Sequence, residues 1–163
     1  MSSEGTWTLV LAKEDFKFSS AHFTLFGPEE AELLHGHNYR VKVELAGSEL
    51  DDEGLLVSFE KVKGAIRELC AWLDDKTLVP QHSRHLQVRA EDESVEIIFA
   101  GRRYVLPAQD VLLLPLANTS IELLARLLWQ KLAPRLDGLR VETLSVEVAE
   151  TAGQSCVYRG RLG

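Results

Sequence analysis

The sequence predicts an α+β protein in which helices pack on one face of an antiparallel sheet. Three observations support this fold class: segments in which polarity alternates residue by residue, two segments with helical spacing of apolar residues, and no glycine fingerprint of a βαβ unit. The chain has 163 residues, of which 45% are hydrophobic and 26% charged, as in an ordinary globular protein. No segment looks like a linker, so we expect a single domain over residues 1–163.

Two alternating segments open the predicted sheet. Between residues 7 and 23 the alternation places Phe18 and His22 on the same side of a strand. The segment Asn38–Gly47 alternates as well, with Tyr39 on its apolar side and charged residues on the other. This pattern is typical of a half-buried antiparallel strand.

Two helices follow from apolar residues three and four apart. Ser58 could cap the first, which runs to about Leu73. The second begins at Thr119–Glu122, where the threonine hydroxyl and the glutamate carboxylate form a predicted capping box. It extends to about Leu132, and Pro134 stops it.

The remaining strands lie between the helices and near the end of the chain. Leu86–Ala90 and Ser94–Phe99, joined by a polar turn, read as a hairpin, to which Arg103–Leu106 could add a third strand. We expect this insertion to span about residues 80–116. A last strand is predicted over Val141–Glu150.

Charge and composition exclude several classes of protein. Eighteen basic and 25 acidic residues give a formal net charge of −7, so neither nucleic acid nor an anionic membrane is an expected partner. No apolar stretch approaches the roughly 20 residues of a membrane span, and the first residues, Met1–Gly5, have no secretory signal pattern. Cys70 and Cys156 form neither a disulfide framework nor a CxxC site. We expect a cytoplasmic protein.

Three of the five histidines are candidates for a metal site. His35 and His37 are two residues apart, so both rings project to the same side of a strand, and His22 ends the preceding strand. If the two strands pair, three neutral imidazoles converge, which suits Zn²⁺ with a fourth position left open. The alternative is a pair of exposed turn histidines and a third one in the core.

Glu150 continues the apolar side of the last strand, where a carboxylate without a partner would be desolvated. It could grip a ligand that presents two adjacent N–H donors. The alternative is an exposed strand end or a pairing with arginine.

These residues occur in an order that resembles one family, the 6-pyruvoyltetrahydropterin and 6-carboxytetrahydropterin synthases. The resemblance covers about residues 16–160, and six motifs are in register. They are Phe-Ser-Ser-Ala-His ending at His22, His35-Gly-His37-Asn-Tyr, Gly54 before Val57-Ser-Phe59, Leu73-Asp74, the helix start at Thr119–Glu122, and Glu150-Thr151 with Tyr158-Arg-Gly160.

The resemblance implies the tunnelling fold (T-fold), a four-stranded antiparallel sheet with two helices on one face. Three subunits would close a twelve-stranded barrel, and two trimers would stack into a homo-hexamer. The resemblance also implies a Zn²⁺ cofactor held by His22, His35 and His37. A pterin substrate would be anchored by Glu150, in a substrate-binding motif shared with Thr151.

The sequence departs from the family where a catalytic cysteine usually precedes His-Gly-His. Glu32-Leu-Leu-His35-Gly-His37 instead matches a branch with glutamate at that place. This branch resembles dihydroneopterin aldolase in activity, and it cleaves the side chain of 7,8-dihydroneopterin triphosphate to 6-hydroxymethyl-7,8-dihydropterin. Glu32 would act as the base; the alternative is a solvated carboxylate in an acidic loop.

A second departure affects the Asp-His pair that follows the family's first helix. Asp74 and Asp75 stand there, and we predict catalytic roles for them beside Glu32. His82 or His85 could replace the missing histidine, although loop histidines are usually exposed. The expected function is a zinc-dependent pterin lyase. The alternatives are a 6-pyruvoyl- or 6-carboxytetrahydropterin synthase without the usual cysteine, or a non-catalytic protein that binds zinc and a pterin.

Overall fold

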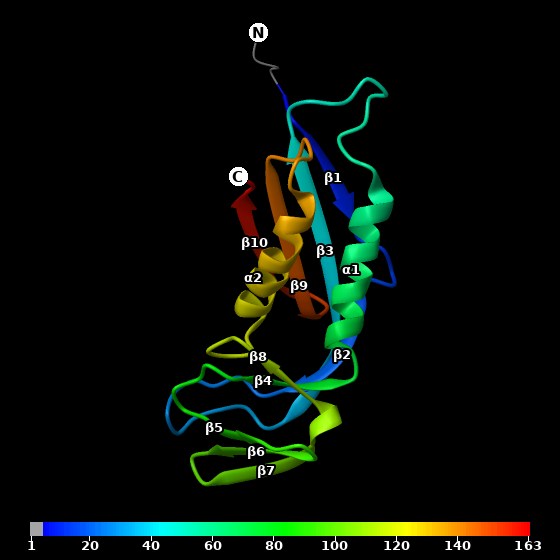
Figure 1. The fold of residues 1–163 in the computed structure, drawn as a ribbon. Helices are drawn as coiled ribbons and strands as arrows, with labels where there is room; N and C mark the ends of the chain where they lie inside the picture. The colour runs from blue at the N-terminus through cyan, green and yellow to red at the C-terminus, as the bar shows by residue number, and fades with distance from the viewer. Residues whose placement is uncertain (1–4) are drawn as a thin grey trace.

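A computed structural model describes residues 5–163; residues 1–4, which open the segment examined for a secretory signal, lie outside it. The larger of two sheets has seven strands in the order β10-β9-β3-β2-β4-β8, with β1 also paired to β3 (Figure 1). Its strands are β1 (Trp7–Leu11), β2 (Lys17–His22), β3 (His35–Gly47), β4 (Lys76–Pro80), β8 (Val111–Leu114), β9 (Thr143–Thr151) and β10 (Gln154–Arg161).

The predicted four-stranded antiparallel arrangement is the centre of this sheet, and the full sheet is larger and mixed. Strands β10, β9 and β3 pair antiparallel, and β1 and β2 pair with successive parts of β3. The strand expected over residues 7–23 is therefore interrupted at residues 12–16, where the backbone carbonyl of Phe16 accepts a hydrogen bond from the amide of Val41 at 2.9 Å. Three of its strands were not predicted: β10 follows the expected last strand and pairs with it antiparallel, and the short strands β4 and β8 extend the sheet by parallel pairing.

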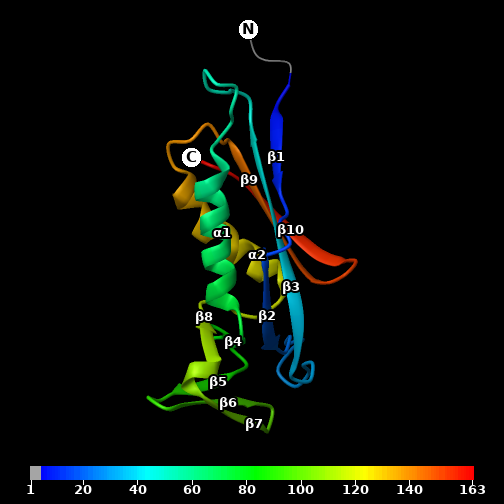
Figure 2. The ribbon, with the colours of Figure 1, turned by 90° about the vertical axis from the view of Figure 1, so that its right-hand side faces the viewer.

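Both helices cover the same face of the large sheet (Figure 2). Helix α1 (Phe59–Leu73) and helix α2 (Ile121–Leu132) bury the predicted apolar stripes against the sheet. The cap of α2 differs from the expectation: Ser120, rather than Thr119, accepts the hydrogen bond from the amide of Leu123. A 3-10 turn, η2 (Ala133–Leu136), contains Pro134 and follows α2.

The predicted insertion forms a separate three-stranded sheet below the large one in Figure 1. It consists of β5 (Gln87–Ala90), β6 (Ser94–Phe99) and β7 (Arg102–Pro107), and the 3-10 helix η1 (Ala108–Asp110) leads on to β8. The small sheet has its own apolar core with residues of the large sheet and of the loop after β2. Of the helices that the structure describes, none is long and apolar enough to cross a membrane.

Candidate metal centre and active site

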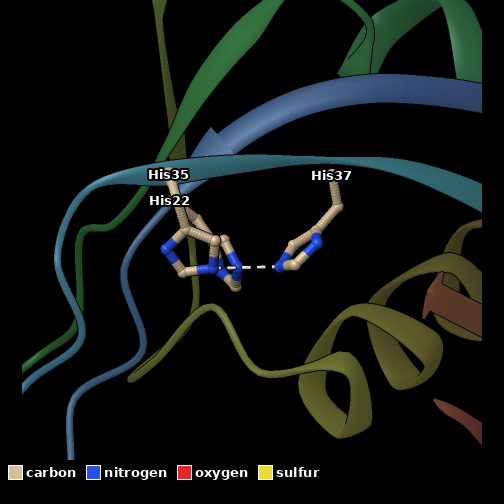
Figure 3. Close-up of side chains that lie close together, drawn as sticks. All are labelled: His22, His35 and His37. Atoms are coloured by element: carbon tan, nitrogen blue, oxygen red, sulfur yellow. Dashed lines mark hydrogen bonds between the residues drawn. The ribbon is translucent and has the colours of Figure 1, made fainter.

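The pairing of β2 with β3 brings the three predicted histidines together. In this antiparallel register His22 is opposite His35, and Ser20 is opposite His37. Alternation along each strand then directs the three imidazoles to the same side (Figure 3). One ligand atom from each ring lies within 4.8 Å of the others, so this histidine triad could hold a metal ion.

Backbone carbonyls determine which ring nitrogens are available. Nδ1 of His22 lies 3.0 Å from the carbonyl oxygen of Thr119, and Nδ1 of His35 lies 2.6 Å from that of Leu33. Because a carbonyl oxygen only accepts hydrogen bonds, each Nδ1 carries the proton and each Nε2 keeps a lone pair. Metal-bound histidines commonly have this kind of outer hydrogen bond.

The residues of the triad fit a zinc-type cofactor. Nε2 of His22 is buried and has no hydrogen-bond partner in the described structure, and the Nε2 atoms of His35 and His37 are 3.0 Å apart. Burial lowers the pKa of His22, which favours the neutral ring that a metal requires. Three histidine ligands and an open fourth position are typical of a catalytic zinc site.

Glu32 lies next to the triad. Its Oε2 accepts a hydrogen bond from the Thr24 amide at 2.9 Å and is 3.7 Å from Nε2 of His35. Burial alone would raise the pKa of Glu32, but the hydrogen bonds from Thr24 outweigh it, so the pKa is lowered. Glu32 is therefore ionised at neutral pH and able to accept a proton.

Glu150 reaches the other side of the triad from the end of β9. Its Oε2 is 3.7 Å from Nε2 of His37, and its side chain is only 23% exposed. The residues before it on the same face of the strand, Val146 and Val148, are fully buried. Thr151 is exposed at the turn into β10, where its hydroxyl donates to the side chain of Gln154 at 2.9 Å.

Asp74 and Asp75 bind the backbone of β2 at Ser19. Oδ1 of Asp74 accepts from the Ser19 amide at 2.7 Å, and the Asp75 amide donates to the Ser19 carbonyl at 2.8 Å. Asp75 has φ of 55°, an uncommon conformation for a residue other than glycine. Among the described residues these contacts join the two aspartates to Ser19 and no bond joins them to the triad, so their catalytic roles stay a prediction.

His82 and His85 lie apart from these residues, in a cavity of about 570 Å³ between the loop after β2 and the segment before α2. Among the described residues, no contact links either histidine to the triad, so the structure gives no support to their replacing the missing histidine. Cys70 is buried in α1, where desolvation raises the pKa of its thiol to about 12. Burial also raises the pKa of Cys156 on β10.

Two residues near the site were missed by sequence reasoning. Tyr39 is fully buried one alternation beyond His37, its hydroxyl has no partner in the described structure, and burial and the charges of Glu150 and Glu32 raise its pKa. The alternation along β3 could have indicated it, because it places Tyr39 on the same side of the strand as His35 and His37. Arg102 donates to the backbone of the Glu32 loop, and no local pattern indicates that contact.

Comparisons with known proteins point to one family. The model of the 6-pyruvoyl tetrahydropterin synthase family matches residues 11–161. The 6-carboxy-5,6,7,8-tetrahydropterin synthase of Bacillus subtilis is 31% identical over 156 residues, which cover 92% of this chain and 85% of that protein. A Methanocaldococcus jannaschii protein provisionally given the same name is 32% identical over 146 residues, 88% of this chain and 89% of its own.

A crystal structure shows the same fold. The 6-pyruvoyl tetrahydropterin synthase of Plasmodium vivax superposes with a TM-score of 0.90 at 26% identity, covering 97% of this chain and 99% of the other. Fold and site together define a T-fold protein of the pterin lyase type. The chain belongs to the 6-pyruvoyl tetrahydropterin synthase family.

Proposed function

We propose that this protein is a cytoplasmic, zinc-dependent lyase that cleaves the side chain of 7,8-dihydroneopterin triphosphate to 6-hydroxymethyl-7,8-dihydropterin. The observation that carries the proposal is the carboxylate of Glu32, 3.7 Å from His35 of the triad, in the sequence position where the family usually has cysteine. Two similar structures, at 25% and 26% identity, are variants of the Plasmodium vivax enzyme in which a catalytic glutamate is replaced by alanine or cysteine. They support a carboxylate in that role.

The chemistry requires a base near a side-chain hydroxyl of the substrate. A zinc ion held by the triad would supply a Lewis acid that lowers the pKa of hydroxyl groups bound to it. Glu32 would accept the proton from the hydroxyl on the second side-chain carbon. The bond between the first and second side-chain carbons then breaks, its electron pair moves into the dihydropterin ring, and an aldehyde carrying the phosphates leaves. Protonation of the first carbon completes the hydroxymethyl product.

Glu150 would orient the ring during this cleavage. A pterin presents its 2-amino group and N3–H side by side, and a carboxylate can accept both hydrogen bonds at once. The position of Glu150 on the apolar side of β9, close to His37, would place the ring next to the triad. Thr151 borders the same position and would form part of the substrate-binding motif.

The names of the relatives favour a second candidate, a 6-carboxytetrahydropterin synthase that works without the usual cysteine. Product identification separates the candidates. Metal-loaded protein is incubated with 7,8-dihydroneopterin triphosphate or 7,8-dihydroneopterin, and the pterins are separated and identified by mass. We expect 6-hydroxymethyl-7,8-dihydropterin. A 6-carboxy or 6-pyruvoyl product would identify the protein as a synthase. Tight binding without turnover would identify it as a non-catalytic protein that binds zinc and a pterin.

Purified protein should contain about one Zn²⁺ per chain, because three imidazoles and an open position suit this ion. His35→Ala should remove most of the metal, as measured by elemental analysis after dialysis against a weak chelator. His82→Ala, on the separate cavity, is the matched control and should retain it. Stoichiometric metal in a variant with all three triad histidines changed to alanine would contradict the site.

The protein should form a homo-oligomer of trimers, a hexamer in the simplest case. The large sheet ends in β10 on one side and β8 on the other, and unpaired strand edges attract further strands. Closing a barrel between subunits would remove such edges. Light scattering at micromolar concentration measures the mass; a monodisperse monomer would contradict the prediction.

A further inference from the structure

Glu32 lies near the end of the loop that joins β2 to β3. The loop must be held in place if the carboxylate of Glu32 is to accept a proton from the substrate. Within the loop, Leu25 and Ala31 form an isolated antiparallel β-bridge, and the Glu32 amide donates a hydrogen bond to the Thr24 carbonyl at 2.9 Å. These local bonds close the loop upon itself. They do not tie it to the rest of the protein, yet proton transfer depends on a base being held within a fraction of an ångström.

Leu25 is buried in the apolar core shared with the small sheet, and two side chains from distant segments add hydrogen bonds to the loop. Asn118, before α2, accepts from the Leu25 amide at 3.1 Å and donates to the Leu25 carbonyl at 2.9 Å. Arg102, on β7 of the small sheet, donates through Nη1 to the carbonyl of Glu32 at 3.0 Å and through Nη2 to that of Ala31 at 3.3 Å. Asn118 therefore holds the first half of the loop, and Arg102 holds the residue of interest itself.

The guanidinium of Arg102 is held in place by its own surroundings. Its Cζ lies 5.1 Å from the centre of the Phe99 ring, which is fully buried, and Phe99 is the strand partner of Arg102. The two residues between them, Ala100 and Gly101, have φ of 46° and 83°, as a tight hairpin turn requires. The rigid planar fork of arginine donates to two neighbouring carbonyls in a fixed geometry, whereas a lysine ammonium is a point charge on a flexible stem.

We propose that Arg102 is a positioning residue for Glu32, and that the small sheet acts on the reaction through this contact. The inference rests on the proposed function, since it assigns Glu32 the role of base. Arg102 acts on the backbone of Glu32 and its neighbour, while the carboxylate remains free to face the triad. The insertion is thus part of the active-site architecture.

Arg102→Ala should lower kcat by about 10- to 100-fold, the range expected when a catalytic group shifts by about an ångström. The KM for the pterin should change less than about twofold, because Glu150 lies on another strand. Arg102→Lys keeps the charge and hydrogen-bond donors but not the planar fork, so it should recover part of the loss. The matched control is Arg103→Ala: Arg103 is exposed and pairs with Glu96 at 2.6 Å, so kcat should stay the same.

Two further measurements separate positioning from general stability. If Arg102 acts through Glu32, the double variant Glu32→Ala/Arg102→Ala should turn over no more slowly than Glu32→Ala. Amide hydrogen exchange of residues 24–32 should speed up in Arg102→Ala and Arg102→Lys, and stay unchanged in Arg103→Ala. The inference would be overturned if the two substitutions lowered kcat by the product of their separate effects, or if hydrogen exchange of the loop stayed unchanged in Arg102→Ala. Absence of turnover in the parent protein would count against the proposed function instead. The exchange rates would then still show whether Arg102 holds the loop.

Discussion

Glu32→Ala should lower turnover by about 10²–10⁴-fold, the range for the loss of a general base, with pterin affinity nearly unchanged. The carboxylate is 3.7 Å from Nε2 of His35 and, with its lowered pKa, is ionised at neutral pH. Steady-state kinetics and calorimetric titration with the pterin measure the two quantities. Glu32→Gln should be nearly as slow, because the amide can still accept the bond from the Thr24 amide but cannot take a proton.

Controls for this prediction come from the same loop. Glu29 and Glu30 are exposed, so Glu29→Ala and Glu30→Ala should change turnover little. Equal small effects from all three alanine variants would mean that Glu32 is a solvated loop residue. The base would then be sought at Asp74 or Asp75, which the structure places in bonds to Ser19.

Glu150→Gln should weaken pterin binding by about 2–4 kcal/mol, or roughly 30- to 1,000-fold. The substitution keeps the size of the side chain but turns an amide donor toward the donors of the pterin. The metal content should stay at the parent level, since Glu150 is outside the triad. Calorimetric titration and elemental analysis measure these two results.

Glu147→Gln is the matched control for Glu150, because Glu147 lies on β9 with its side chain on the opposite face. There it pairs with Lys42 at 3.4 Å, away from the triad. Its substitution should leave pterin affinity unchanged. If Glu150→Gln binds the pterin as tightly as the parent does, Glu150 is not the anchor.

The histidine triad could be predicted because it depends only on alternation and on one strand pairing. His22 ends one alternating segment, and His35 and His37 begin the next, so pairing the two neighbours in the chain brings all three rings to one side. The helices could be predicted equally well, since their apolar stripes are buried as the spacing predicts. The T-fold implied by the motifs is confirmed by the solved structures.

Features that depend on contacts distant in sequence escaped prediction. Strands β4 and β8 are short, pair in parallel across more than 30 residues, and have no alternation of their own. The role of Ser120 in place of Thr119 as the cap reflects a choice between adjacent hydroxyl groups that sequence alone does not make. The bonds from Arg102 join residues about 70 positions apart, and nothing in the local pattern of β7 indicates them.

The protonation of the two cysteines bears on how the protein would respond to oxidants. The Cys70 thiol, with a pKa near 12, stays protonated inside α1, and the pKa of Cys156 is raised as well. Oxidants and alkylating agents attack thiolates, and a cysteine nucleophile is lost once it reaches the sulfinic stage. A carboxylate base does not undergo this oxidation. With Glu32 as the base, pterin cleavage would continue under peroxide stress that silences a cysteine-dependent relative.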